Sequence, residues 1–351
     1  MDIRVLPASQ LSSDELASWS RVQEGDCALR SPFFRPEFTQ IVAEMRNDVE
    51  VAILVEDGKS VGFFPFHRGK HNVAHPVGCG LSEHQGVIVG NGVEWNIERL
   101  LQACNIRALY FDHLSTGQRQ FTPYYWVEDS SHCMDLSQGF RRYREEKRRN
   151  GCRVFKRINQ KSRKIEREVG PLRLVRHAYD DDLFHRLLSW KTQLHGRMPD
   201  WKIEMLHEVA CTGQPSFAGV LFGLFAGDHV ISLLLGIRSG STLHGWLSGF
   251  DAAFQKYSPG LLLWERLATK AESLGIQCID LGRGSERYKV ELGSRAVRLA
   301  EGAIDLRPLL STFCRGWWKA KEMLSESRFH RPVQNLVRSI RGAVYYRATS
   351  Y

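Results

Sequence analysis

Short runs of hydrophobic and polar positions fill the first part of the chain and predict helices and strands in mixed order. The turn-forming residues Glu56–Lys59 separate two apolar runs, and this arrangement predicts a β-hairpin. The elements expected here are helices over Ser13–Glu24 and Glu37–Arg46, strands over Val51–Val55 and Val61–Phe66, a Gly-rich loop over Pro76–Gly80, a strand over Leu81–Val89, a helix over Trp95–Cys104 and a strand over Ala108–His113. This order is typical of an α+β or mixed α/β domain.

A charged helical segment follows at Gln138–Val169. Its apolar positions recur at intervals of three and four residues, which places them on one stripe of a helix. Those positions are Phe155, Ile158, Ser162, Ile165 and Val169. We expect the Asn150-Gly151 pair to break or kink the helix. The segment is interpreted as a connector between two lobes.

The second half repeats the order of the first half. Its expected elements are helices Asp181–Thr192 and Asp200–Ala210, strands Ser216–Phe225, Val230–Arg238 and Thr242–Leu247, helix Leu261–Leu274 and strand Gln277–Leu281. The repeated order of helix pair, antiparallel hairpin, helix and strand indicates an internal duplication. The predicted fold class is therefore α+β (mixed α/β), with two tandem lobes that each hold a mixed, mostly antiparallel sheet flanked by helices.

Composition fits a folded protein of two domains: 351 residues, of which 43% are hydrophobic and 25% charged. The residues near Met1 lack the apolar core of a signal peptide, and no uninterrupted run is long enough to span a bilayer. The eight cysteines show no Cys-x-x-Cys spacing. We therefore expect reduced thiols, a cytoplasmic location and no metal site.

Charge is concentrated in two segments. Arg141–Glu168 carries +9 and Arg315–Tyr351 carries +6, so the rest of the chain is about −6. In the tail, Phe313, Trp317, Trp318 and Leu324 lie among Arg315, Lys319 and Lys321. This pattern fits a basic amphipathic helix on an anionic membrane surface, and equally a helix packed on the body of the protein. The expected domains are 1–136, the connector 137–169, a catalytic lobe 170–308 and the tail 309–351.

Candidate chemistry gathers between Gly249 and Lys289. Ser258-Pro259-Gly260 ends a strand-and-loop segment and opens a helix, and proline suits the first helical turn. Free N–H groups at such a helix start, together with the helix dipole, form an anion site. A pyrophosphate bound there would place a thioester at the strand edge. An ordinary strand-to-helix turn explains the same residues equally well.

The sequence resembles a known family over this region. The residues that carry the resemblance are Tyr257-Ser258-Pro259-Gly260-Leu261-Leu262, Ala271-x-x-x-Gly275, and Asp280-x-Gly282-x-Gly284-x-Glu286-x-Tyr288-Lys289. They are similar to the BioF2-like, CelD/BcsL-type acetyltransferases, relatives of the GNAT and FemAB enzymes, several of which are tied to exopolysaccharide or cellulose biosynthesis. The resemblance is sharpest from Ser216 to Gly293. It implies an acyl-CoA donor, no metal and a donor site in the second of two GNAT-like lobes.

By position, the resemblance implies that Ser258, Pro259 and Gly260 form the phosphate-binding turn. Tyr288 and Lys289 match the aromatic–Lys pair that FemAB-type enzymes use near the reacting carbonyl. The sequence departs from ordinary GNAT enzymes because it lacks their Gln/Arg-x-x-Gly-x-Gly/Ala pyrophosphate loop. Donor contacts are therefore assigned no more finely than this turn.

Acyl transfer needs a base for the acceptor and a cation or donor for the oxyanion. Lys289 is the candidate for charge stabilisation, with a surface charge as the alternative. Asp251 and His244 are candidate bases, with a turn-forming carboxylate and a structural histidine as their alternatives. Tyr257 is the candidate proton donor to the leaving thiolate, unless it only packs. The polar run Ser82–Gly86 is a candidate acceptor-facing segment of the first lobe.

The predicted function is acyl-CoA-dependent N- or O-acetyl transfer, with a sugar, amino acid or peptide as acceptor, in exopolysaccharide biosynthesis. The basic tail suggests partners at the membrane surface or in a polysaccharide-synthesis complex, and a peripheral place at the inner membrane face. Two alternatives stay open. One is a FemAB-like aminoacyl transferase that uses aminoacyl-tRNA, motivated by the basic segment Arg141–Arg167. The other is a non-catalytic scaffold.

Overall fold

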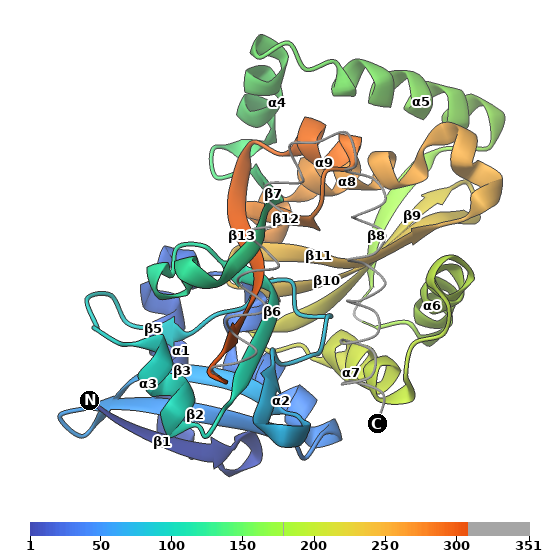
Figure 1. Ribbon diagram of the computed structural model, residues 1–351. Coiled ribbons are helices and arrows are strands. Elements are labelled where there is room, and N and C mark those ends of the chain that lie inside the picture. The colour runs from blue at the N-terminus through green and yellow to red at the C-terminus, as the bar shows by residue number, and fades with distance from the viewer. Residues whose placement is uncertain (178, 308–351) are drawn as a thin grey trace, which may run out of the picture. The chain divides into compact units, whose positions relative to one another are not determined.

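Two compact units make up the chain in the computed structural model, which describes residues 1–177 and 179–307 (Figure 1). Unit 1 comprises residues 1–25, 42–128 and the described residues from 299 onward. Unit 2 comprises residues 26–41 and 129–298. The segment 137–169, expected as a connector, belongs to unit 2, and the expected tail 309–351 lies outside the described residues.

Unit 1 contains a mixed sheet built on the predicted hairpin. Its strands are β1 (Asp2–Pro7), β2 (Val49–Glu56), β3 (Lys59–Arg68), β4 (Val73–His75), the short β5 (Ile88–Val89), β6 (Ala108–Ser115) and the end of β13 (Arg295–Asp305). In the order β1-β2-β3-β4-β6-β13, every neighbouring pair is antiparallel except β4 and β6, which are parallel. Its helices are α1 (Ser13–Gly25), α3 (Ile97–Ala103) and the end of α2 (Pro36–Met45).

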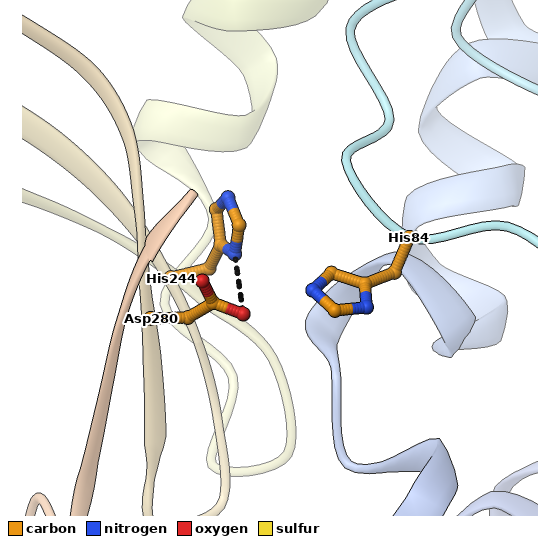
Figure 2. A group of neighbouring side chains, drawn as sticks. All are labelled: His84, His244 and Asp280. Carbon is orange, nitrogen blue, oxygen red and sulfur yellow. Dashed lines mark ion pairs between the residues drawn. The ribbon is translucent and has the colours of Figure 1, made fainter. Parts of the chain in front are cut away.

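Unit 2 contains a second mixed sheet with the same plan. Its strands are β8 (Leu172–His177), β9 (Ala218–Ala226), β10 (His229–Ser239), β11 (Thr242–Phe250), β12 (Cys278–Arg283) and most of β7 (Tyr125–Asp135). In the order β8-β9-β10-β11-β12-β7, only β11 and β12 are parallel. Figure 2 draws His244 and Asp280, which are neighbours across this parallel pair.

The two sheets correspond strand by strand, which confirms the predicted mixed α/β class with tandem lobes. In each unit a helix pair follows the first strand of the sheet, and one helix connects the two parallel strands. The last strand of each sheet comes from the other half of the sequence. β7 ends the first half of the chain but pairs with β12 in unit 2, whereas β13 ends the second half but pairs with β6 in unit 1. No sequence pattern predicted this exchange.

The remaining helices of unit 2 agree with most expected boundaries. They are α4 (Gly139–Arg149), α5 (Val154–Glu168), α6 (Asp181–His195), α7 (Asp200–Cys211), α8 (Pro259–Lys270) and α9 (Arg287–Leu292). The break between α4 and α5 falls at Asn150 and Gly151, as predicted, and Gly151 adopts φ +76°. Among the described residues, no helix combines the length and apolar character that crossing a membrane requires.

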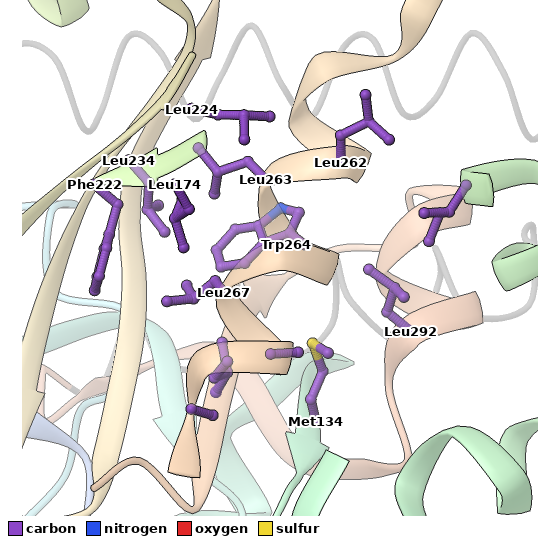
Figure 3. Close-up of a cluster of buried hydrophobic side chains, with 14 of the residues drawn as sticks. Met134, Leu174, Phe222, Leu224, Leu234, Leu262, Leu263, Trp264, Leu267 and Leu292 are labelled. Carbon is purple, nitrogen blue, oxygen red and sulfur yellow. The ribbon is translucent and has the colours of Figure 1, made fainter. Parts of the chain in front are cut away.

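The main core of unit 2 lies between α8 and the sheet (Figure 3). Trp264, Leu267 and Leu263 of α8 pack with Leu234 and Phe222 of the central strands. The predicted stripe of α5 joins this core through its Phe155, Ile158 and Ile165 side chains. The connector is therefore part of the folded unit and buries the apolar side of a basic helix.

α8 carries one buried acidic side chain, that of Glu265. α5 contacts α8, and Arg144 of α4 and Glu166 of α5 interact electrostatically with Glu265. The helix is also shorter than predicted, because a separate 3₁₀ turn forms at Glu272–Leu274.

The core predicts a clear difference between two leucine truncations. Leu267→Ala should lower the free energy of unfolding by about 2–5 kcal/mol, because it leaves a cavity under α8. Leu194→Ala removes the same atoms from a side chain that is 71% exposed, and should cost less than about 0.5 kcal/mol. Urea unfolding of both variants measures the difference. Equal losses would contradict the assignment of Leu267 to the core.

Candidate functional site

The parallel pairing of β11 and β12 is short. Only three residue pairs join the strands, namely Thr242 with Cys278, Leu243 with Ile279 and His244 with Asp280. β11 continues for six residues beyond His244, to Phe250, with no further β12 partner among the described residues. Beyond His244, the edge of β11 that faced β12 therefore has no strand partner in the described part of the chain.

A β-bulge in β11 lies directly after this point. Leu235 of β10 pairs with Leu247, but the next residue, Gly236, pairs with Gly245. Trp246 is therefore the extra residue on β11. A bulge bends its strand and increases the local twist, and bulges are common beside active sites. The bulge explains physically why β11 departs from β12 at His244.

The start of α8 combines the three residues predicted to bind phosphate. Ser258 adopts φ +57° and ψ +58°, the left-handed conformation, and Pro259 begins the helix. The backbone carbonyl of Ser258 accepts hydrogen bonds from the N–H groups of Leu261 and Leu262. A Cβ atom at Gly260 would meet nothing within 4 Å. The first turn thus offers open space and the positive end of the helix dipole.

His244 and Asp280 form a buried pair where the two strands part (Figure 2). The Nδ1 atom of His244 lies 3.5 Å from Oδ2 of Asp280. The other carboxylate oxygen of Asp280 accepts hydrogen bonds from Ser131 Oγ at 2.5 Å and from the Gly282 N–H at 2.9 Å. These donors hold the carboxylate in place beside the imidazole. His84, also drawn in Figure 2, belongs to unit 1.

Phe33 covers the other side of the His244 ring within unit 2. The two rings meet edge to face, with centroids 4.9 Å apart, and Phe33 also contacts Trp246. The imidazole is therefore packed against Phe33 and lies beside the Asp280 carboxylate. Sequence reasoning chose His244 from its strand position alone and had no signal for Phe33.

Asp251 and Tyr257 have structural contacts of their own. The Asp251 carboxylate accepts a hydrogen bond from the Ala253 N–H at 2.9 Å and caps the 3₁₀ turn Ala252–Tyr257. Tyr257 is buried, and its hydroxyl donates to Glu168 of α5 at 2.7 Å. This hydrogen bond lowers the pKa of Glu168. Asp251 thus makes a turn-forming contact and Tyr257 a packing contact, and their catalytic roles stay predictions.

Lys289 lies in α9 and is almost fully buried. Its Nζ donates to the backbone carbonyl of Arg283 at 2.5 Å and lies 3.3 Å from Glu286 Oε2. The lysine therefore fixes the turn that follows β12. The neighbouring Tyr288 is partly buried and packs against the core of unit 2.

Side chains of the basic helices α4 and α5 contact α9. Backbone carbonyls at the end of α9 accept hydrogen bonds from Tyr143 and Lys147 of α4, and Arg157 of α5 pairs with Glu291. Such side-chain donors satisfy carbonyls that a helix end leaves open. Part of the basic charge of this segment therefore has a structural role.

Unit 1 closes the equivalent position. Beyond the parallel pairing of β4 and β6, Gln85 pairs with β6: its N–H donates to the His113 carbonyl at 2.9 Å, and its carbonyl accepts from the Ser115 N–H at 3.0 Å. The Gln85 side chain also accepts hydrogen bonds from the N–H groups of Asp112 and His113. In place of the predicted strand Leu81–Val89 the structure has the short β5, and Gln85 pairs with β6, the counterpart of β12.

Three residues of the site were not selected from the sequence: Asp280, Ser131 and Phe33. In the sequence analysis Asp280 appears only as part of a motif. An acidic residue next to apolar strand positions could have marked it as a candidate site residue. Ser131 comes from β7, which the chain order would place in the other lobe. Its contribution depends on the exchanged strand and was not accessible to sequence reasoning.

Comparisons with known proteins agree with this geometry. Residues 152–290 match the family model described as an acetyltransferase (GNAT) domain. The match includes β11, α8, β12 and most of α9. Over these residues, which lie within unit 2, the chain is similar to GNAT acetyltransferase domains. No curated protein matches the sequence.

Solved structures support the same fold. FemX superposes with a TM-score of 0.56 at 10% identity, over 89% of this chain and 99% of that one. The C-terminal domain (DUF2156) of an Agrobacterium fabrum protein described as a lysylphosphatidylglycerol synthetase gives 0.52 at 10% identity, over 85% and 93%. A conserved protein of unknown function from Bacteroides thetaiotaomicron gives 0.51 at 9% identity, over 83% and 97%. At these identities the likeness concerns the fold alone.

Glu265 gives a pH-dependent prediction for α8. Burial raises its pKa, and the nearby Arg266 and Arg144 oppose the shift. Because the folded state disfavours the charged form, Glu265 lowers stability as the pH rises above about 4.5, its ordinary pKa. Glu265→Gln should therefore be more stable than wild type by roughly 1 kcal/mol at pH 7, and the gain should shrink toward pH 4.

Urea unfolding at pH 4, 5.5 and 7 measures this dependence. Glu272→Gln is the matched control, since Glu272 is exposed in the next turn and should show no such trend. A gain for Glu265→Gln that stays constant with pH would contradict the buried-charge explanation.

Proposed function

We propose that this chain transfers an acyl group from acyl-CoA to an amine or hydroxyl acceptor, with the donor bound in unit 2. The observation that carries the proposal is the end of the β11–β12 pairing at His244 and Asp280. Beyond it, an unpaired strand edge and the start of α8 follow each other along one chain segment. The GNAT match over residues 152–290 supports the same location.

The two parts of the donor suit these two features. Pyrophosphate carries negative charge, which the positive end of the α8 dipole attracts; we assign this role to Ser258, Pro259 and Gly260. The extended arm of CoA contains amide groups, which can pair with an open strand edge as an added strand does. We assign that edge to β11 after His244.

His244 is the base that we assign to acyl transfer. The acceptor must lose a proton as it attacks the thioester carbon, and an oriented imidazole serves this step near neutral pH. Asp280 faces Nδ1, so we assign Nε2 to the proton transfer. We assign Lys289 a positioning role through the Arg283 carbonyl and Glu286, in place of direct charge stabilisation.

Gly260→Asp tests the donor site. The new side chain enters open space, and an acidic residue in the first helical turn stabilises a helix, so folding should be preserved. Its charge should repel phosphate and weaken acetyl-CoA binding by about tenfold or more, a loss of about 1.4 kcal/mol. The acetyl-CoA dependence of the thermal unfolding midpoint measures the affinity.

Gly260→Asn is the matched control, because it has the same size without the charge and should bind acetyl-CoA nearly as wild type does. His244→Gln should also bind the donor, but should lose about 10²-fold or more of the transfer rate once an acceptor is known. No stabilisation of wild type by any acyl-CoA, or equal effects of Asp and Asn at position 260, would contradict the proposed donor site.

A second candidate is aminoacyl transfer from aminoacyl-tRNA. Exposed arginines on α4, such as Arg141 and Arg142, favour it, although each pairs with a glutamate one turn later. The fold likeness to FemX is compatible with it. Phosphate binding by such a helix depends steeply on salt. Binding of tRNA that weakens steeply between 50 and 200 mM salt, without any effect of acyl-CoA, would favour this candidate.

The acceptor and the setting are the finer parts of the proposal. From the sequence resemblance we propose a sugar, amino acid or peptide acceptor and a role in exopolysaccharide biosynthesis in the cytoplasm or at the inner membrane face. A scaffold role without catalysis is the competing view. Acyl transfer that is lost in His244→Gln without loss of stability would exclude a pure scaffold.

A further inference from the structure

A cysteine in unit 1 occupies a constrained backbone position. Cys79 adopts φ +42°, between Gly78 at φ +86° and Gly80 at φ +83°. Non-glycine residues rarely adopt positive φ, and such strain often marks functional positions. The turn is closed by hydrogen bonds from the Cys79 N–H to the Pro76 carbonyl and from the Leu81 N–H to the Gly78 carbonyl. The backbone therefore fixes where the thiol lies.

A histidine and a carboxylate form a chain of contacts that leads to the cysteine turn. His67 lies in β3 and is 2% exposed. Its Nδ1 lies 3.1 Å from Oδ1 of Asp48. Arg46 holds the same carboxylate through two hydrogen bonds of 3.0 and 2.7 Å. Asp48 is thus fixed in position and in turn fixes the His67 ring.

The opposite edge of the His67 ring faces the cysteine turn. The Gly78 N–H donates to Nε2 at 3.2 Å, and the Cys79 thiol is hydrogen-bonded to the same ring. The Gly78 contact places the cysteine turn against the Nε2 side of the ring. Burial opposes a charge on His67, but Asp48 and Cys79 together raise its pKa to about 9.

Other charged groups around the ring favour the same chemistry. Arg46 interacts electrostatically with Cys79 as well as with Asp48, so it places a positive charge near the thiol. His75 of β4 also interacts with His67, but burial lowers the pKa of His75 to about 4. His75 is therefore neutral at pH 7 and does not repel a protonated His67.

We propose that Cys79, His67 and Asp48 form a second reactive site, in which Cys79 is a nucleophile that accepts an acyl group from a small activated ester or thioester. His67 takes the thiol proton as Sγ attacks the carbonyl carbon. The new S–C bond forms, the bond from carbon to the leaving oxygen or sulfur breaks, and the leaving group departs as an anion. The proton leaves His67 for solvent or for the leaving group. Nucleophile, base and orienting carboxylate are the parts that such a step requires.

Acetylation by p-nitrophenyl acetate tests this site in the full-length protein. We expect Cys79 to be acetylated at pH 7 at least about tenfold faster than Cys27, an exposed cysteine that serves as internal control. Release of p-nitrophenolate follows the reaction, and peptide mass spectrometry locates the acetyl group. The reagent contains no CoA, so the result is independent of the donor site in unit 2.

Two variants separate the mechanism from simple exposure. Asp48→Asn should slow acetylation of Cys79 about tenfold or more, because it removes the charge that supports the protonated ring. Asp57→Asn changes an exposed turn residue in the same way and should leave the rate unchanged. Acetylation of Cys79 no faster than of Cys27 would overturn the proposal even if Asp48→Asn fails to fold. An unchanged rate in a folded Asp48→Asn protein would overturn the role of His67 and Asp48.

Discussion

The bend of β11 away from β12 is the constraint on which the functional account depends. Parallel strands stabilise each other by regular hydrogen bonds, so a strand that leaves its partner exposes backbone groups that must find other partners. The bulge at Trp246 permits the departure, and the β10 pairing continues on the other edge of β11. His244 and Asp280 lie at the last shared position. The geometry thus places an oriented imidazole beside an open strand edge.

The two units of the duplicated fold differ at the point where the pairing of their parallel strands ends. Both sheets have one parallel pair and the same strand order, but in unit 1 Gln85 adds backbone hydrogen bonds to β6 beyond the pairing with β4. In unit 2 no described residue extends the pairing of β11 with β12, the counterpart of β6, beyond Asp280. This difference is a physical reason for assigning donor binding to unit 2. It also frees unit 1 for other chemistry, such as that of Cys79 and His67.

Exchange of the last strands makes the two halves of the sequence depend on each other. Ser131 reaches Asp280 only because β7 pairs with β12. A substitution in the first half can therefore alter the site in the second. The domain boundaries read from the sequence do not include this dependence, since they cut the chain where the composition changes.

Sequence reasoning recovered the local elements well and the long-range contacts poorly. Periodicity placed most helices and the central hairpins, and the helix start at Ser258–Gly260 was correctly located. It could not show that Tyr257 donates to Glu168 or that Lys289 binds the Arg283 carbonyl. These contacts join residues whose proximity depends on tertiary packing. Asp280 was passed over for the same reason, because its importance follows from Ser131 and His244.

Amide hydrogen exchange with and without acetyl-CoA tests the central claim most directly. If the donor binds along the open edge of β11 and at the start of α8, exchange should slow in residues 245–250 and 260–262. The segment 84–87 of unit 1, whose edge is already filled, should not change. Protection confined to unit 1, or no protection of either segment in unit 2 at saturating acetyl-CoA, would contradict the account.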